Sequence, residues 1–151
     1  MNLIIKQVLN FSNTEDTLTF LCNVSALLKE YFEDTNWLGF YLLKDNKLHL
    51  GPFQGKVACE LIDIGKGVCG TAVKERKVLN INNVHEFKGH IACDSASNSE
   101  IVLPLIYKDN VLGVLDIDSE SFNRFSKDDE ELLIDIAKII SERLTKNKNY
   151  V

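Results

Sequence analysis

The sequence predicts an α+β fold in which helices pack on a mostly antiparallel sheet of six strands. Apolar residues recur at helical spacing near both ends of the chain, and six short runs of branched and aromatic residues lie between them. Turn sequences at residues 44–47 and 108–110 join two pairs of these runs into hairpins. The chain has 151 residues, of which 45% are hydrophobic, so we expect a single domain over residues 1–151.

The first half of the chain predicts one helix followed by three strands. Ser12 and Glu15 have the spacing of a capping box, so we expect the helix to begin there and to end near Phe32. We expect Cys22, on this helix, to lie in the core. The expected apolar face comprises Leu18, Leu21, Val24, Leu28 and Tyr31. Strands are expected over residues 36–43, 48–53 and 57–62.

The second half predicts a short helix over residues 70–75 and a strand over residues 78–81. A long polar loop follows over residues 82–98, and loops of this length in a small domain are often functional. A second hairpin is expected from strands 101–107 and 111–117. Ser126 caps a final helix, whose apolar face comprises Leu132, Leu133, Ile136, Ile140 and Leu144.

Composition argues against several classes of function. The net charge is −5 and no basic stripe occurs, so we expect no nucleic-acid partner. There is no apolar run long enough to span a membrane and no signal peptide at the start, so we expect a cytoplasmic protein. In that reducing compartment the four cysteines are core residues, metal ligands or reactive thiols rather than structural disulfides.

Residues 89–100 are the first candidate for a reactive site. Cys93 lies there among small and polar residues, with His90 three positions before it and Asp94 directly after it. Glu100 follows at the start of an apolar strand. A solvent-accessible thiol beside ionisable groups is suited to sulfur chemistry.

Two acids on a later strand are a second candidate. Asp116 and Asp118 are two positions apart, so strand alternation predicts that both share a face with Leu112 and Val114. Acids on a core face are costly unless they are paired or used in chemistry. The alternative is that the strand has already left the core at this point.

Aromatic and cysteine residues suggest a pocket. Trp37 and Tyr41 share a strand face, either as ordinary core or as an apolar wall for a ligand with a methyl or thioether group. Cys59 and Cys69 flank the turn at residues 65–67, which lets both approach one cleft, although burial is the more common state of an isolated cysteine.

Two other motifs carry little weight. Residues 65–70 match the G-x-G-x-x-G pattern, but the following helix is too short for a dinucleotide-binding crossover and no acid closes the next strand. The histidines and cysteines lack the paired spacing of common zinc sites. We therefore expect no metal and no bound cofactor.

The chain resembles the free methionine-(R)-sulfoxide reductases, which are stand-alone GAF-domain enzymes. The resemblance extends from about Trp37 to Ile140. Its specific mark is the cysteine triple, in which ten positions separate Cys59 from Cys69 and twenty-four separate Cys69 from Cys93. The matching segments are residues 67–72, 89–94, 99–102 and 115–119.

The resemblance implies a GAF fold, a homodimer and reduction of the free amino acid rather than of methionine sulfoxide within proteins. It implies that Cys93 is the nucleophile and becomes a sulfenic acid, that Cys59 resolves it as a disulfide, and that thioredoxin reduces the disulfide. Cys69 matches the third cysteine of the family, whose part is less settled and for which taking over the recycling step is one open role. Whether Cys59 or Cys69 closes the disulfide therefore stays open.

The resemblance also implies the substrate contacts. Glu100 and Asp118 match carboxylates that hold the sulfoxide oxygen, with Asp116 beside them. Trp37 and Tyr41 match the aromatic wall around the methyl group of the substrate. The backbone of Ile91 and Ala92, just before Cys93, matches the part that holds the substrate carboxylate. The competing functions are a GAF module that binds a small ligand and a thiol-based redox sensor.

Overall fold

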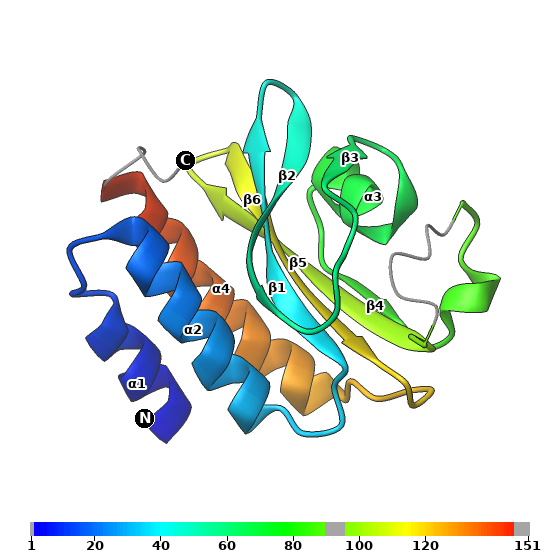
Figure 1. Cartoon of the computed structure of the whole chain (residues 1–151), viewed down its shortest axis with the longest axis horizontal. Helices are drawn as coiled ribbons and strands as arrows, with labels where there is room; N and C mark the ends of the chain where they lie inside the picture. Colours follow the sequence, from blue (N-terminus) through cyan, green and yellow to red (C-terminus); the bar gives the residue numbers. More distant parts are fainter. Residues whose placement is uncertain (1, 90–95, 147–151) are drawn as a thin grey trace.

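The computed structural model describes residues 2–89 and 96–146 and confirms the predicted α+β fold (Figure 1). Six strands form one sheet in the order β3-β2-β1-β6-β5-β4, and every neighbouring pair is antiparallel. The strands are β1 (Trp37–Lys44), β2 (Lys47–Gln54), β3 (Leu61–Asp63), β4 (Leu79–Ile81), β5 (Ser99–Tyr107) and β6 (Asn110–Ser119).

Helices cover both faces of the sheet unequally (Figure 1). The helices α1 (Leu3–Phe11), α2 (Thr17–Tyr31) and α4 (Lys127–Lys146) bury the larger core against one face. The short helix α3 (Gly67–Glu75) lies on the opposite face, and a 3₁₀ turn η1 (Val84–Glu86) follows β4. The smaller core under α3 comprises Trp37, Tyr41, Leu48, Ile62, Val68, Cys69, Ala72, Val73, Val102 and Val114.

The predicted start of the first long helix is wrong. Ser12 ends the separate helix α1, because its backbone N–H donates to the carbonyl oxygens of Val8 and Leu9. Asp16 caps α2 instead, and its carboxylate accepts a hydrogen bond of 2.9 Å from the backbone N–H of Thr19. The sequence prediction missed α1 because a capping-box pattern at the end of one helix was assigned to the start of the next.

Three residues assigned to the buried face of α2 are exposed. Leu18 and Tyr31 are 53% and 47% exposed, and Cys22 is an exposed free thiol. The buried stripe of the helix runs instead through Phe20, Leu21, Val24 and Leu28. Leu18 and Cys22 lie four positions apart, so both fall on the outer edge of that stripe.

The final helix begins as predicted. The Asp129 backbone N–H donates to Ser126 Oγ at 3.1 Å, and the Ser126 N–H donates to the Asp129 carboxylate at 3.1 Å. Near the other end of α4, the buried Arg143 donates to Thr17 Oγ1 at 3.0 Å and to the carbonyl oxygen of Thr14 at 2.8 Å. These bonds fix the start of α2 against α4.

The predicted face of Leu112 is also wrong. Leu105 pairs with Gly113 and Ile106 pairs with Val111, so β6 contains one extra residue at Leu112. This bulge turns Leu112 toward the helix-covered core and Val111 toward the α3 face. Beyond the bulge the alternation is regular. The third strand is also shorter than expected, since β3 covers only Leu61–Asp63.

Among the described residues, no helix has both the length and the apolar character that crossing a bilayer requires.

Candidate active site

The candidate site lies on the α3 face of the sheet, where three neighbouring strands form a row of side chains. Trp37 on β1 pairs with Asp118 on β6, and Asp118 pairs with Glu100 on β5. Directly opposed residues project from the same face, so these side chains adjoin one another. Asp116 projects from the same face two residues before Asp118. All three acids are buried, with 5–9% of their surface exposed.

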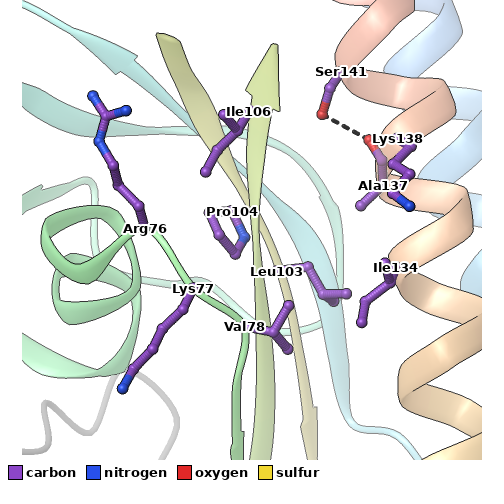
Figure 2. A pocket seen from close by; sticks show the side chains of 10 residues that line it. All are labelled: Arg76, Lys77, Val78, Leu103, Pro104, Ile106, Ile134, Ala137, Lys138 and Ser141. Atoms are coloured by element: carbon purple, nitrogen blue, oxygen red, sulfur yellow. Dashed lines mark hydrogen bonds between the residues drawn. The ribbon is translucent and has the colours of Figure 1, made fainter. Parts of the chain in front are cut away.

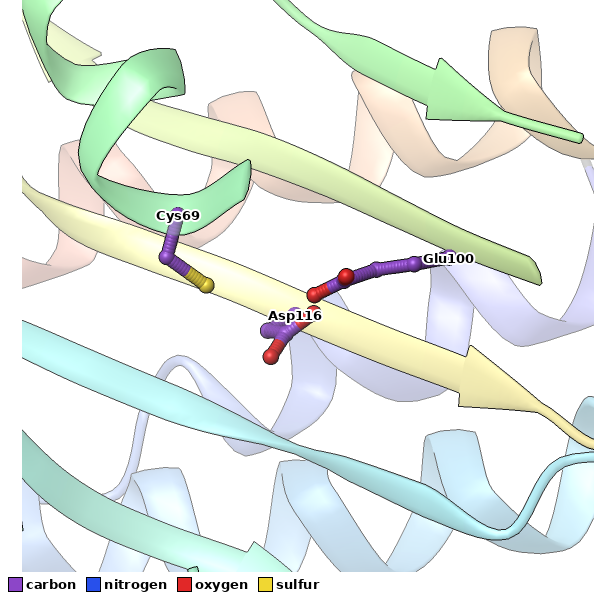
Figure 3. A group of neighbouring side chains, drawn as sticks. All are labelled: Cys69, Glu100 and Asp116. Atoms are coloured by element: carbon purple, nitrogen blue, oxygen red, sulfur yellow. The ribbon is translucent and has the colours of Figure 1, made fainter. Parts of the chain in front are cut away.

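Cys69, on helix α3, belongs to the same group of side chains. It projects from α3 toward Glu100 and Asp116 (Figure 3). The sulfur and one carboxylate oxygen from each acid all lie within 4.8 Å of one another. In the described part of the chain these are the side chains grouped closely enough to hold a metal ion. They also suit a network that shares protons, since two acids and a thiol are buried together.

Burial and mutual repulsion keep a proton in this group. Burial raises the pKa of Glu100 well above its usual range, and the charges of Asp116 and Asp118 raise it further. Burial also raises the pKa of Asp116, but hydrogen bonds from Glu100 and Cys69 oppose that rise. Of the two carboxyls, Glu100 is therefore the one that more readily keeps a proton, which gives the site a candidate proton donor.

The thiol of Cys69 also stays protonated. Burial raises its pKa well above the usual range, and the charge of the neighbouring Asp116 adds to the rise. Asp116 keeps one acceptor free, because its Oδ1 is buried and has no hydrogen-bond partner among the described residues. A buried polar atom without a partner costs about 1–3 kcal/mol, so this oxygen is suited to receive a donor from a ligand.

An aromatic wall stands beside the acids. The rings of Trp37 and Tyr41 stack with centroids 5.9 Å apart, and Trp37 and Phe53 stack at 5.2 Å. Gly39 makes room for this arrangement, since a Cβ atom there would clash with Cβ of Phe53 and would lie 2.9 Å from Cη2 of Trp37. Phe53 was not predicted as a site residue; its position at the end of β2, paired with Gly39, becomes evident only from strand register.

The same wall holds the segment that carries Cys59. The Tyr41 hydroxyl donates a hydrogen bond of 3.1 Å to the backbone carbonyl of Cys59, and Trp37 Nε1 donates one of 3.1 Å to the carbonyl of Lys56. Burial raises the pKa of Tyr41, so its hydroxyl remains a donor. Cys59 is disulfide-bonded, whereas Cys22 and Cys69 are free thiols.

The structure thus brings together on one face every predicted site residue that it describes. Three further predicted site residues, Cys93, Ile91 and Ala92, lie outside the described residues. The described residues that form the site are Trp37, Tyr41, Cys59, Cys69, Glu100, Asp116 and Asp118.

A separate hollow of about 240 Å³ lies between β5 and α4, near the end of α3 (Figure 2). Its floor is apolar, with Leu103 and Ile134 facing each other, and Arg76, Lys77 and Lys138 lie around it. It contains none of the predicted site residues and no acid. The hollow therefore lacks the proton donor and the thiol that mark the α3 face.

Comparison with known proteins agrees with the geometry. The family model described as GAF domain matches residues 14–144. The chain is 61% identical over 114 residues to the free methionine-R-sulfoxide reductase of Escherichia coli, covering 76% of this chain and 69% of that protein.

Two solved structures, both holding substrate, are also similar. The fRMsr of Staphylococcus aureus in complex with substrate has a TM-score of 0.88 and 50% identity, covering 94% of each chain. The free methionine-R-sulfoxide reductase of Neisseria meningitidis in complex with its substrate has a TM-score of 0.91 and 38% identity, covering 98% of this chain and 90% of that chain. The chain belongs to the free methionine-R-sulfoxide reductase family of GAF-domain proteins.

Proposed function

We propose that this protein reduces free L-methionine (R)-S-oxide to L-methionine, as the names of its relatives indicate for those proteins. The observation that carries the proposal is the row formed by Glu100, Asp118 and Trp37 on one sheet face. It sets a protonated carboxylic acid beside an aromatic ring. A sulfoxide needs both, because its oxygen must be protonated to leave and its methyl group is apolar.

Substrate binding follows from the surfaces around the row. The stacked rings of Trp37 and Tyr41 contact the S-methyl group. The free Oδ1 of Asp116 accepts a hydrogen bond from the bound ligand. The backbone of Ile91 and Ala92 holds the substrate carboxylate, as the family resemblance implies. A pocket that recognises the charged ends of a free amino acid excludes methionine sulfoxide within a peptide.

The chemical step transfers one oxygen atom. The Cys93 thiolate attacks the sulfoxide sulfur, and Glu100 donates the proton that the sulfoxide oxygen requires. The oxygen passes to Cys93 as a sulfenic acid, and methionine is released. The substrate sulfur gains two electrons and the sulfur of Cys93 loses two. No resident cofactor is needed, because the cysteine supplies the electrons.

A disulfide then restores the site. The Cys59 thiol condenses with the Cys93 sulfenic acid, which forms the disulfide and releases one water. Two observations favour Cys59 over Cys69 in this step: Cys59 is disulfide-bonded in the structure, and Cys69 is a buried free thiol. An external dithiol, thioredoxin, then reduces the disulfide by exchange and is itself oxidised.

We extend the proposal to a cytoplasmic homodimer. Free thiols at Cys22 and Cys69 suit a reducing compartment. Large apolar side chains remain exposed on α1 and α2, including Leu3 and Leu18, which suits burial against a second copy. Light scattering of the purified protein tests this: a mass of two chains is expected, and a mass of one chain at micromolar concentration contradicts it.

The activity is tested by supplying the protein with free L-methionine (R)-S-oxide and dithiothreitol and measuring methionine. We expect multiple turnovers with the R epimer and none with the S epimer or with N-acetylmethionine sulfoxide. The second pair of substrates controls for nonspecific reduction by the thiol. Binding of the R epimer without turnover would indicate a ligand-binding module, and disulfide formation without methionine would indicate a redox sensor.

A further inference from the structure

The role of Cys69 is not explained by the disulfide chemistry. It is a free thiol with only 5% of its surface exposed, and it projects from α3 into the acid group (Figure 3). Its sulfur, together with one oxygen each from Glu100 and Asp116, forms a group whose atoms all lie within 4.8 Å of one another. The carboxyl groups of Glu100 and Asp116 are therefore polar neighbours of the Cys69 thiol.

We infer that Cys69 is a positioning residue, whose neutral thiol donates a hydrogen bond to Asp116 and so keeps the shared proton on Glu100. This inference rests on the proposed function, since it concerns the acid that protonates the sulfoxide. Cys69 itself neither attacks the substrate nor closes a disulfide.

The surroundings of Cys69 oppose a redox role. Attack on a sulfenic acid or a disulfide requires a thiolate. Here burial raises the pKa of the Cys69 thiol well above its usual range, and the charge of the nearby Asp116 raises it further. Forming a thiolate would add a negative charge to a buried group that already contains three acids, Glu100, Asp116 and Asp118. Cys59, by contrast, is disulfide-bonded, and its backbone carbonyl accepts a hydrogen bond from the Tyr41 hydroxyl.

The same surroundings favour a donor role. The hydrogen bonds from Cys69 and from Glu100 are the influences that lower the pKa of Asp116 against the effect of burial. An ionised Asp116 in turn raises the pKa of Glu100. Cys69 therefore stabilises the arrangement in which Asp116 carries the charge and Glu100 carries the proton. Without the thiol, Asp116 competes with Glu100 for that proton.

Serine and alanine separate the possible roles. Serine keeps a donor at the position but has no redox chemistry, whereas alanine has neither. We expect Cys69→Ser to retain multiple turnover. We expect Cys69→Ala to raise the pKa of Asp116 by about half a unit to one unit, as the loss of a weak hydrogen bond to a charged group predicts. The acid limb of the first-turnover pH profile should move to higher pH by the same amount.

The experiment compares the unsubstituted protein, Cys69→Ser, Cys69→Ala and the exposed control Cys22→Ala. First-turnover methionine formation is measured against pH with the reduced proteins, and multiple turnover is measured with thioredoxin as reductant. Independently of activity, ¹³C NMR of the aspartate side-chain carboxyls follows the ionisation of Asp116. A shifted Asp116 titration in Cys69→Ala, restored in Cys69→Ser, supports the inference.

Two results would overturn it. If both Cys69 variants complete a first turnover but fail to recycle, Cys69 is a redox cysteine. If the Asp116 titration is the same in Cys69→Ala as in the unsubstituted protein, the thiol serves only in packing. Failure of the unsubstituted protein to form methionine would instead contradict the proposed function, and the NMR titration would still test the Cys69–Asp116 relationship.

Discussion

The Tyr41 hydroxyl donates a hydrogen bond of 3.1 Å to the carbonyl of Cys59, so one residue of the aromatic wall also holds a disulfide-bonded cysteine. Trp37 repeats the arrangement through its indole nitrogen and the carbonyl of Lys56. The surface proposed to contact the methyl group of the substrate and the segment proposed to resolve the sulfenic acid are therefore mechanically connected. Changes in one are expected to affect the other.

Tyr41→Phe isolates this connection, because the ring is retained and only the hydroxyl is lost. A net hydrogen bond contributes about 1 kcal/mol, so we expect disulfide formation to slow about fivefold. Trapping of the sulfenic acid with dimedone after rapid mixing measures the step. Tyr107→Phe, at the far end of β5, is the matched control. An unchanged rate of disulfide formation in Tyr41→Phe would show that the hydrogen bond does not position Cys59.

Glu100→Gln removes the proposed proton donor while keeping its shape. General acid catalysis commonly contributes a factor of about 10²–10⁴, so we expect the first turnover to slow at least about a hundredfold. A proton donor with a raised pKa acts while it is protonated, so activity should fall as pH rises through that pKa. This alkaline decline should disappear in Glu100→Gln and persist in the exposed control Glu86→Gln. A normal rate in Glu100→Gln would exclude the acid role.

The acid group also predicts a dependence of stability on pH. Glu100 has a raised pKa in the folded state, so the folded protein binds its proton more tightly than the unfolded chain does. The contribution of this proton binding to the free energy of unfolding is complete below the ordinary pKa of 4.5. It is lost as the pH rises through the pKa that Glu100 has in the folded state. Urea unfolding should show the unsubstituted protein losing stability relative to Glu100→Gln as pH rises from 4.5. A constant difference between the two proteins would contradict the buried, protonated state.

Gly39 is predicted to be required for the aromatic wall. In Gly39→Ala the added Cβ atom clashes first with Cβ of Phe53, and it lies 2.8 Å from the Phe53 Cα and 2.9 Å from Cη2 of Trp37, so the paired strand β2 and the rings of the wall must shift. Overpacking of this kind costs about 1–3 kcal/mol, and displacement of the ring should raise the KM for the sulfoxide. The chain has a single tryptophan, so its fluorescence reports the movement directly. Gly51→Ala, on the same hairpin, is the control whose tryptophan emission should not change.

Strand alternation was sufficient to predict much of this site. It predicted that Asp116 and Asp118 share one face and that Trp37 and Tyr41 share one face. In the structure both pairs have this arrangement. Alternation is a local property with a period of two, so it can be read along one strand. It fails where the period is broken, and the extra residue at Leu112 reversed the predicted orientation of that side chain.

The relationships between strands were not predictable from the sequence. The alignment of Glu100 with Asp118 and Trp37 depends on the register of three strands that are distant in the chain. The contact of Cys69 with this row depends on where α3 packs. Burial of Cys22 was predicted wrongly for a related reason: an apolar neighbourhood in the sequence does not determine which helix face meets the sheet.

The central claim, that Cys93 performs the oxygen transfer and Cys59 resolves it, is tested most directly by counting methionine. The reduced unsubstituted protein, Cys93→Ser, Cys59→Ser and the control Cys22→Ser are each supplied with free L-methionine (R)-S-oxide and with thioredoxin and its reductase. We predict sustained turnover for the unsubstituted protein and the control, none for Cys93→Ser, and about one methionine per chain for Cys59→Ser. Methionine formation by Cys93→Ser, or sustained turnover by Cys59→Ser, would contradict this account.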